Sequence, residues 1–408
     1  MAGLWSCSAQ TGTGLPVADI EDAIDNIKSV KLSKYATGIK YIKLETADSA
    51  LLGNISTIAF DDKHIYIGST DKQKTIHLFS KDGKFIKNVG TRGRASGEYT
   101  AIRSIIPLQD MNAIMVEGGN KAVIYSLEDG KALKDIPFEK FLTEQVTTTR
   151  IINGRNVTSK SQHVQNIFYD GTGSFTILTF DKNSGKQDLI ILDTALAVKN
   201  TIALRPGEKY TSETYTQKGA VIKFPPMAIS GLCYINNGDI NFFHGMHDTL
   251  YTVKEDKAIP KLAINYGYYQ KDPHNLTAED IWARVIHESD NLIFLDARMP
   301  VSNKLEANAN GTAHMIYDKN LRETILLKFS KDLTGDFSGV EGGGAFLNDL
   351  DNGLPFWPYH LEGNKMYMIC DAGKFIELSD KYNSIKMKEV ASQLTDESNP
   401  ILIEVTLK

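Results

Sequence analysis

Short runs of β-branched and aromatic residues recur along the chain, separated by turns of Asp, Gly, Lys and Asn. The clearest example is residues 54–90, where four such runs follow one another. A run of this composition between turn residues predicts a short β-strand, and four in succession predict an antiparallel meander. This repeated unit constrains the fold more than any other feature of the sequence.

The unit occurs six times, and its first strands begin about 45 to 70 residues apart. A period of this size with four strands per unit is typical of a β-propeller, in which each sheet is one blade around a central channel. The sequence therefore predicts an all-β, six-bladed β-propeller of four-stranded antiparallel blades.

The sixth unit is incomplete. It has two obvious strands, then a polar, helix-like stretch from Lys374 to about Ser398, and the chain ends in one further strand. Residues 39–46 precede the first complete blade and have no partner in their own unit. Their pairing with the C-terminal strand would complete the blade and remove an exposed edge. We therefore expect a single domain over residues 35–408, preceded by a tail over residues 1–34.

The cysteines are far apart in the sequence. Cys233 and Cys370 lie in apolar strand-like runs, which favours buried free thiols. Cys7 lies in LWSC, which is similar to the lipobox in which a bacterial lipoprotein is acylated. Only the residues MAG precede LWSC, so the charged start and apolar stretch of a signal peptide are missing. An ordinary cysteine in a tail is the alternative. No apolar run of about 18 residues follows, so a lipid anchor is the only membrane contact we expect.

Composition and motifs argue against several function classes. A net charge of −5 gives no global reason for a nucleic-acid partner. The sequence contains no GxSxG elbow, HExxH motif or P-loop, so no catalytic residue is assigned. The cysteine spacing fits no zinc site, and neither a metal nor a cofactor is expected. We expect a monomer.

The meander also determines which loops share a face. The turn between the second and third strands and the crossover to the next blade must lie on one face of the disc. That face would carry every long insertion, including a small helical one near residues 268–284 that bears Trp282, and the other face would carry only tight turns. Long loops on one rim indicate the working face.

The loop 90–99, GTRGRASGEY, lies on that face. It is glycine-rich like a phosphate-binding loop, but it leads into another strand rather than a helix. Arg92 and Arg94 could bind a carboxylate, sulfate or phosphate through their planar guanidinium groups. Alternatively, they pair with Glu98 or with loop carbonyls.

Other candidate ligand-binding residues are scattered over the same face. Trp357, with Tyr359 and His360, could form an aromatic platform for a sugar or peptide, or could pack at the start of the last blade. Arg103 and His163 lie at or near innermost strands, whose side chains can reach the channel. His247 lies with His244 in a tight turn, which does not direct the two imidazoles at one point. We therefore assign no metal there.

The chain resembles six-bladed β-propeller proteins related to NHL-repeat propellers, which are abundant in gut Bacteroidetes and include many predicted lipoproteins. The resemblance is carried by FSKDGKFIKNVGTRGRASGEY, HDTLYTV with PKLAINYG, LPFWP and NPILIEVTLK, in family order. Where the family usually has Gly-Pro-Gly-Glu, this chain has Ala95 to Glu98, and only the Gly-Glu end is kept. The resemblance implies the fold and a cell-envelope location. It implies no particular activity, because most members lack an assigned one.

Two functions follow from these observations. The first is a non-catalytic envelope binding or scaffold propeller, attached to a membrane if Cys7 is acylated, whose loop-rich face binds a glycan, a peptide or an envelope protein. The alternative is a propeller hydrolase or lyase that acts on a saccharide or lactone at the mouth of the channel. It requires His, Asp, Glu and Arg side chains gathered there.

Overall fold

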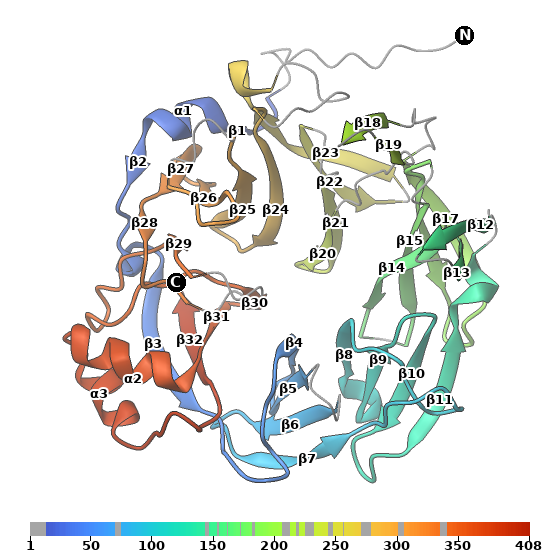
Figure 1. The fold of residues 1–408 in the computed structure, drawn as a ribbon, viewed down its shortest axis with the longest axis horizontal. Helices are drawn as coiled ribbons and strands as arrows, with labels where there is room; N and C mark the ends of the chain where they lie inside the picture. Colours follow the sequence, from blue (N-terminus) through green and yellow to red (C-terminus); the bar gives the residue numbers. More distant parts are fainter. Residues whose placement is uncertain are drawn as a thin grey trace.

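The structure is a computed structural model. It describes residues 14–69, 75–142, 147–152, 155–160, 162–171, 173–181, 184–205, 213–217, 220–224, 232–243, 248–255, 257–270, 279–300, 306–334 and 341–408. Six sheets surround a common centre, which confirms the six-bladed β-propeller (Figure 1).

Each blade is an antiparallel meander whose first strand lies nearest the centre. Blade 1 consists of β4 (Ile55–Phe60), β5 (His64–Ser69), β6 (Ile76–Ser80) and β7 (Phe85–Val89), and blade 2 of β8 (Ser104–Leu108), β9 (Ala113–Glu117), β10 (Lys121–Ser126) and β11 (Ala132–Pro137). Blade 3 consists of β14 (Gln162–Tyr169), β15 (Phe175–Asp181), β16 (Gln187–Leu192) and β17 (Val198–Arg205), and blade 4 of β20 (Leu232–Asn236), β21 (Asp239–Phe243), β22 (Thr249–Lys254) and β23 (Lys257–Asn265). Blade 5 consists of β24 (Trp282–Glu288), β25 (Leu292–Arg298), β26 (Thr312–Asp318) and β27 (Glu323–Leu327).

Blade 6 is closed by the two ends of the chain. It consists of β30 (His360–Glu362), β31 (Lys365–Cys370) and the C-terminal β32 (Ile401–Leu407), with β3 (Ala36–Lys43) as its outermost strand. β3 pairs antiparallel with β32, and Tyr41 stands opposite Ile403. The predicted closure by the N- and C-terminal strands is confirmed.

The segment before β3 packs on the propeller from Val17 onward, whereas we expected a tail over residues 1–34. β1 (Val17–Asp19) adds to β23 in parallel, and β2 (Ile27–Lys28) adds to β27 in parallel. Between them, α1 (Ile20–Asp25) buries Ile20, Ala23 and Ile24. We call residues 17–34 the strap. It covers the outer strand edges of blades 4 and 5, which explains physically why it is ordered as part of the domain.

The core lies between neighbouring blades. Strand residues that alternate toward one blade face and the other form an apolar cluster at each seam, as between blades 5 and 6, where Phe294, Trp357 and Met368 are buried together. Cys370 belongs to this cluster, and Cys233 belongs to the cluster between blades 3 and 4. Both are buried free thiols, as predicted.

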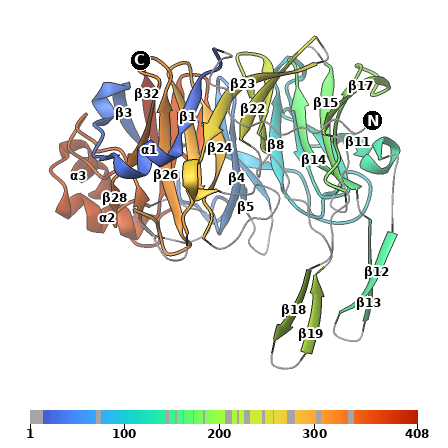
Figure 2. The same ribbon diagram turned by 90° about the horizontal axis from the view of Figure 1, so that it is seen from above.

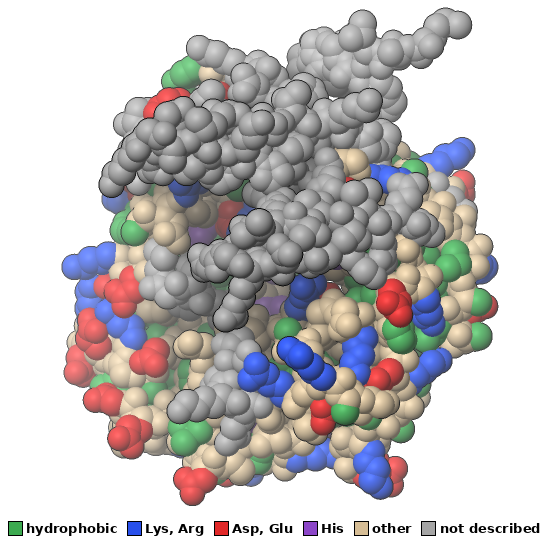
Figure 3. Space-filling model, turned by 45° about the vertical axis from the view of Figure 1, so that its right-hand side comes forward, with side chains coloured by type: hydrophobic (Ala, Val, Ile, Leu, Met, Phe, Trp, Pro, Cys, Tyr) green, Lys and Arg blue, Asp and Glu red, His purple; other side chains and the backbone are tan. Residues whose placement is uncertain are grey.

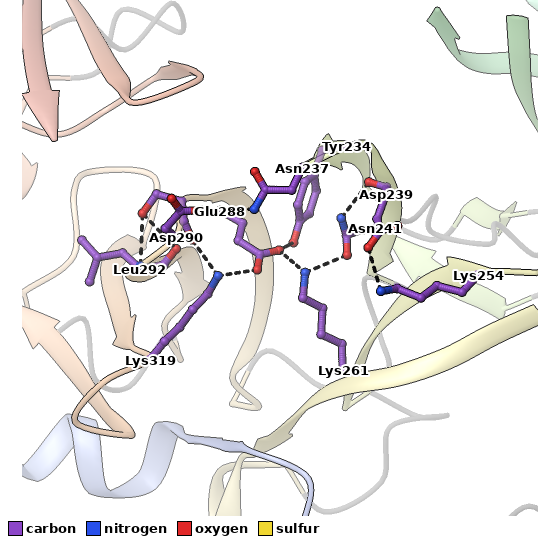
Figure 4. A network of polar contacts seen from close by, with 11 residues as sticks. Tyr234, Asn237, Asp239, Asn241, Lys254, Lys261, Glu288, Asp290, Leu292 and Lys319 are labelled. Atoms are coloured by element: carbon purple, nitrogen blue, oxygen red, sulfur yellow. Dashed lines mark hydrogen bonds and ion pairs between the residues drawn. The ribbon is translucent and has the colours of Figure 1, made fainter. Parts of the chain in front are cut away.

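A buried carboxylate also joins blades 4 and 5 (Figure 4). The Glu288 side chain is fully buried at the end of β24, and its oxygens accept hydrogen bonds from Tyr234 Oη (2.8 Å), Lys261 Nζ (2.7 Å) and Lys319 Nζ (2.5 Å). Lys261 also donates to Asn241 Oδ1 at 2.9 Å. Burial and the nearby Glu288 charge raise the pKa of Tyr234, so this phenol remains a donor.

One face carries the large insertions. The hairpins β12 (Thr147–Ile152) with β13 (Arg155–Lys160) and β18 (Glu213–Gln217) with β19 (Ala220–Phe224) lie in the crossovers on either side of blade 3 and project from the same side of the disc (Figure 2). The helices α2 (Ala372–Lys381) and α3 (Ile385–Ala391) lie between β31 and β32 toward that side, as the helix-like stretch predicted. We call this side the loop-rich face.

The insertion near residues 268–284 is not helical where the structure describes it. It begins with a 3₁₀ turn, Gly267–Tyr269, and Trp282 opens β24 instead of lying on a helix. The other 3₁₀ turns are Leu32–Lys34, Gln109–Met111 and Phe138–Phe141, and the short strands β28 (Phe329–Ser330) and β29 (Gly343–Gly344) pair beside blade 5.

Candidate functional site

Two predicted site residues, Arg103 and His163, lie at the channel end of the loop-rich face. Each innermost strand begins where a crossover arrives from the previous blade, so the first residues of these strands share one end of the channel. Arg103 directly precedes β8, and His163 is the second residue of β14. β30 is shorter and pairs with the first half of β31, so His360 lies further along the channel, against Phe60 at the far end of β4. Figure 3 shows this face obliquely, with histidine side chains in its central hollow and Lys and Arg side chains on the rim.

A polar row crosses blade 5 at this end. Arg284, Asp296 and His314 stand opposite one another on β24, β25 and β26. Arg284 donates to Asp296 Oδ2 from Nε (3.2 Å) and from Nη2 (2.8 Å). His314 Nε2 lies 3.9 Å from Asp296 Oδ1. We call these three residues the blade 5 row.

The His314 end of the row, away from the channel, is fixed by packing. His314 Nδ1 lies 2.7 Å from the Gly344 carbonyl oxygen, and the imidazole stacks on Trp357 at 4.4 Å with an angle of 4°. Trp357 also contacts Phe294 and Phe346 and is fully buried. The structure thus gives Trp357 the packing position that was the alternative to a ligand platform, and it leaves no face of the indole open.

The Arg284 end of the row, toward the channel, is open. The Arg284 side chain is 49% exposed, while Asp296 is 14% and His314 5% exposed. A carboxylate that holds two guanidinium nitrogens restricts the rotamers of the arginine, so the Nη1 donors keep one direction. The row is therefore a guanidinium held in position at the channel end of the loop-rich face.

Two histidines lie further along the channel than the row, at the seam between blades 5 and 6. His287 and His360 have their ring centroids 6.5 Å apart, and His287 hydrogen bonds to the Tyr359 backbone. Burial, and then the neighbouring His360, lower the pKa of His287 to about 4, so this imidazole is neutral at pH 7. His360 also packs against Phe60 of blade 1 at 5.1 Å.

Across the channel, Arg103 neighbours a buried carboxyl group. Glu117 is 2% exposed, and its Oε2 accepts a hydrogen bond from Ser104 Oγ at 2.9 Å. Burial raises the pKa of Glu117, while the Ser104 bond and the Arg103 charge act against that shift. The Arg103 side chain itself is exposed.

Arg92 and Arg94 are also exposed, on the crossover from blade 1 to blade 2. The loop is held by other groups. Glu98 Oε2 accepts the Ala95 N–H at 2.9 Å, and Gly97 accepts a hydrogen bond from Tyr125 Oη at 2.7 Å. Glu98 is thus bound to the loop backbone, and neither arginine forms an ion pair with a described residue.

The remaining predicted residues fall into two groups. His163 lies at the mouth with its ring edge-on to Phe180 at 5.5 Å. Cys7 and His247 lie outside the described residues. Among the described residues, no cluster of three or more His, Cys, Asp and Glu side chains could hold a metal ion.

Two cavities lie away from the mouth. One of about 300 Å³ is lined by Lys34, Tyr35 and Asp318 among others, and one of about 340 Å³ is lined mainly by strap residues. The Asp318 carboxylate already accepts hydrogen bonds from Tyr35 Oη (2.7 Å) and Lys34 Nζ (3.2 Å). The Asp318 carboxylate is thus occupied within the fold, and we place the candidate site at the mouth instead.

Sequence reasoning missed the blade 5 row. Each member is a polar residue next to apolar residues of a strand run: Arg284 in WARVIHE, Asp296 in LIFLDAR and His314 in AHMIYD. Three successive strands with a polar residue inside an apolar run are a signal for such a row. The register that aligns the three residues becomes known only from the structure.

The chain is a six-bladed β-propeller with insertions on one face. The chain belongs to the family "Domain of unknown function (DUF4934)", whose model matches residues 15–406. No curated protein resembles the chain closely enough to count as a match.

Solved structures resemble it in fold. A Bacteroides fragilis protein predicted to be exported is 14% identical with a TM-score of 0.60, over 96% of this chain and 99% of that one. A DUF4221 family member from Bacteroides vulgatus is 10% identical with a TM-score of 0.44, over 91% of this chain and 97% of that one. Among the described residues, no helix is long and apolar enough to cross a membrane.

Proposed function

We propose that this propeller is a non-catalytic binding or scaffold protein of the cell envelope, and that its loop-rich face binds a glycan, a peptide or an envelope protein. The observation that carries the proposal is the one-sided arrangement of this face. The two hairpins project from the side of the disc on which Arg103 and Arg284 lie near the channel, and α2 and α3 lie at the outer edge of blade 6 (Figure 2). The opposite face has tight turns such as Asn237–Gly238, which offer little surface for recognition.

The proposed location has two supports. A structural relative is predicted to be exported, and Cys7 lies in a lipobox-like sequence. Acylation of Cys7 would place the propeller on a membrane surface. Labelled palmitate should then enter the full-length protein expressed in a Bacteroides host, and Cys7→Ser should abolish the labelling. Labelling that persists in Cys7→Ser, or its absence from the wild type, would refute the anchor.

A thermal-shift screen of the purified protein against glycan and peptide libraries, followed by a pull-down from envelope extracts, tests the binding function. A ligand or partner that raises the melting temperature of the protein is expected, because ligands that bind only the folded state stabilise it. If no glycan, peptide or envelope protein binds, the proposal is wrong.

The seam between blades 5 and 6 supports the alternative enzyme function. His287 and His360 lie near the Arg284–Asp296 pair, and His287 has a lowered pKa. Such a group of titratable side chains suits acid–base chemistry on a saccharide or lactone. Release of reducing ends or ring-opened product, lost in His287→Gln, would replace the binding proposal with this one.

A further inference from the structure

We propose that the mouth of the loop-rich face recognises a carboxylated sugar unit, with its carboxylate on the Arg284 guanidinium and its ring against Trp282. This proposal rests on the binding function above and names the chemistry of the ligand. The anchor is the blade 5 row, and the aromatic surface comes from the same strand.

The guanidinium is prepared to receive an anion. Both Nε and Nη2 of Arg284 point to one oxygen of Asp296, at 3.2 and 2.8 Å, while half of the side chain is exposed. Asp296 is in turn backed by His314, whose ring is fixed between Gly344 and Trp357. A planar fork held in this way can accept a second carboxylate through the nitrogens that Asp296 leaves open.

The proposed contact depends on the direction of the guanidinium donors, because Asp296 offsets the Arg284 charge and two carboxylates, Glu279 and Asp280, precede Trp282. His287 carries no charge at pH 7, and the Asp296 charge is offset by the guanidinium that it holds. Arg103 stands exposed at the mouth on blade 2. Arginine is permanently charged, so Arg103 adds one positive charge at the mouth beside the neutral Arg284–Asp296 pair.

Trp282 identifies the ligand as a sugar. Trp282 and Arg284 are two residues apart on β24, and Ala283 and Val285 are buried in the core between blades 4 and 5. Alternate residues of a strand point to opposite sides, so Trp282 and Arg284 share the side away from that core. An aromatic ring beside an arginine matches the apolar face and the carboxylate of a uronic acid. An acidic peptide would use the arginine without needing the indole.

Isothermal titration with oligogalacturonate and with its methyl ester tests the proposal. The two probes have the same sugar rings, and only the first is charged. We expect the acid to bind and the ester to bind at least tenfold more weakly. Arg284→Gln should weaken binding of the acid about tenfold to a hundredfold, which is the range for loss of a charge-assisted hydrogen-bonded pair. Trp282→Ala should also weaken it.

Arg322→Gln is the matched control. Arg322 is an exposed arginine in the turn between β26 and β27 on the opposite face, so its loss changes the net charge equally without touching the mouth. It should bind the acid as the wild type does. Arg284→Lys keeps the charge but not the planar guanidinium, and its affinity for the acid should lie between those of the wild type and Arg284→Gln. Equal melting temperatures of the three proteins would show that the differences come from recognition and not from misfolding.

The outcomes separate this inference from the proposed function. Failure of oligogalacturonate and hyaluronan oligosaccharides to bind overturns the inference. So does binding that Arg284→Gln leaves unchanged, or an acidic peptide that binds as tightly and is insensitive to Trp282→Ala. If neutral glycans or a protein partner still bind in those cases, the binding function stands.

Discussion

Lys261 Nζ lies 2.7 Å from Glu288 Oε2, and this contact joins the outermost strand of blade 4 to the innermost strand of blade 5. The carboxylate also holds Lys319 of blade 5 and Tyr234 of blade 4. A single buried group thus collects donors from two sheets at the face opposite the mouth. It stabilises their relative position more specifically than apolar packing can.

Loss of this carboxylate should destabilise the whole domain. Glu288→Ala leaves two lysines, each about one-quarter exposed, with no partner for their charges. We expect the free energy of unfolding in urea to fall by about 3 kcal/mol, as for other broken buried ion pairs. Lys84→Ala removes an exposed pair with Asp82 and should change it by less than about 1 kcal/mol. Equal effects of the two variants would contradict the structure.

The strap gives a second stability test. Ile20 is fully buried against blades 4 and 5, so Ile20→Ala should cost about 3 kcal/mol in the free energy of unfolding. Asp22→Ala, at an exposed position of the same helix, is the control and should cost little. A tail that did not pack on the propeller would make both substitutions neutral.

His287 should make the fold sensitive to mild acid. Its pKa is about 4 in the folded protein and 6.5 in an unfolded chain, so the unfolded chain binds the extra proton in between. The stability that neutral His287 contributes is complete above pH 6.5 and is lost as the pH falls toward 4. The melting temperature of His287→Gln should therefore fall less than that of the wild type when the pH is lowered from 7 to 4.5. Parallel losses would show that His287 does not titrate in this way.

The hairpins should be separable from the fold. Thr147 pairs with Lys160, so an Asn-Gly turn can replace residues 148–159 without moving either end. Within the described chain, β12 and β13 pair only with each other, and we expect the melting temperature to remain near that of the wild type. A partner retained in the pull-down should be lost or weakened. The double variant Asp129→Ala, Lys131→Ala on the opposite face is the control and should retain the partner. If the variant without the hairpin retains the partner equally well, the β12–β13 hairpin is not part of the binding surface.

The sequence predicted the blades because turn residues and β-branched runs are local signals. It also predicted the β3–β32 pairing, since one unpaired strand remained at each end of the chain. The strap escaped prediction because β1 and β2 contain only three and two residues, too few for a strand period. The blade 5 row escaped it because cross-strand register depends on the bulge between Val285 and His287.

The strap also sets an order for folding. Residues 17–43 contribute strands to blades 4, 5 and 6, whose other strands lie more than 200 residues later in the chain. Residues 17–43 therefore remain unpaired during synthesis until the strands of blades 4 to 6 have been made. Such distant contacts make folding slow.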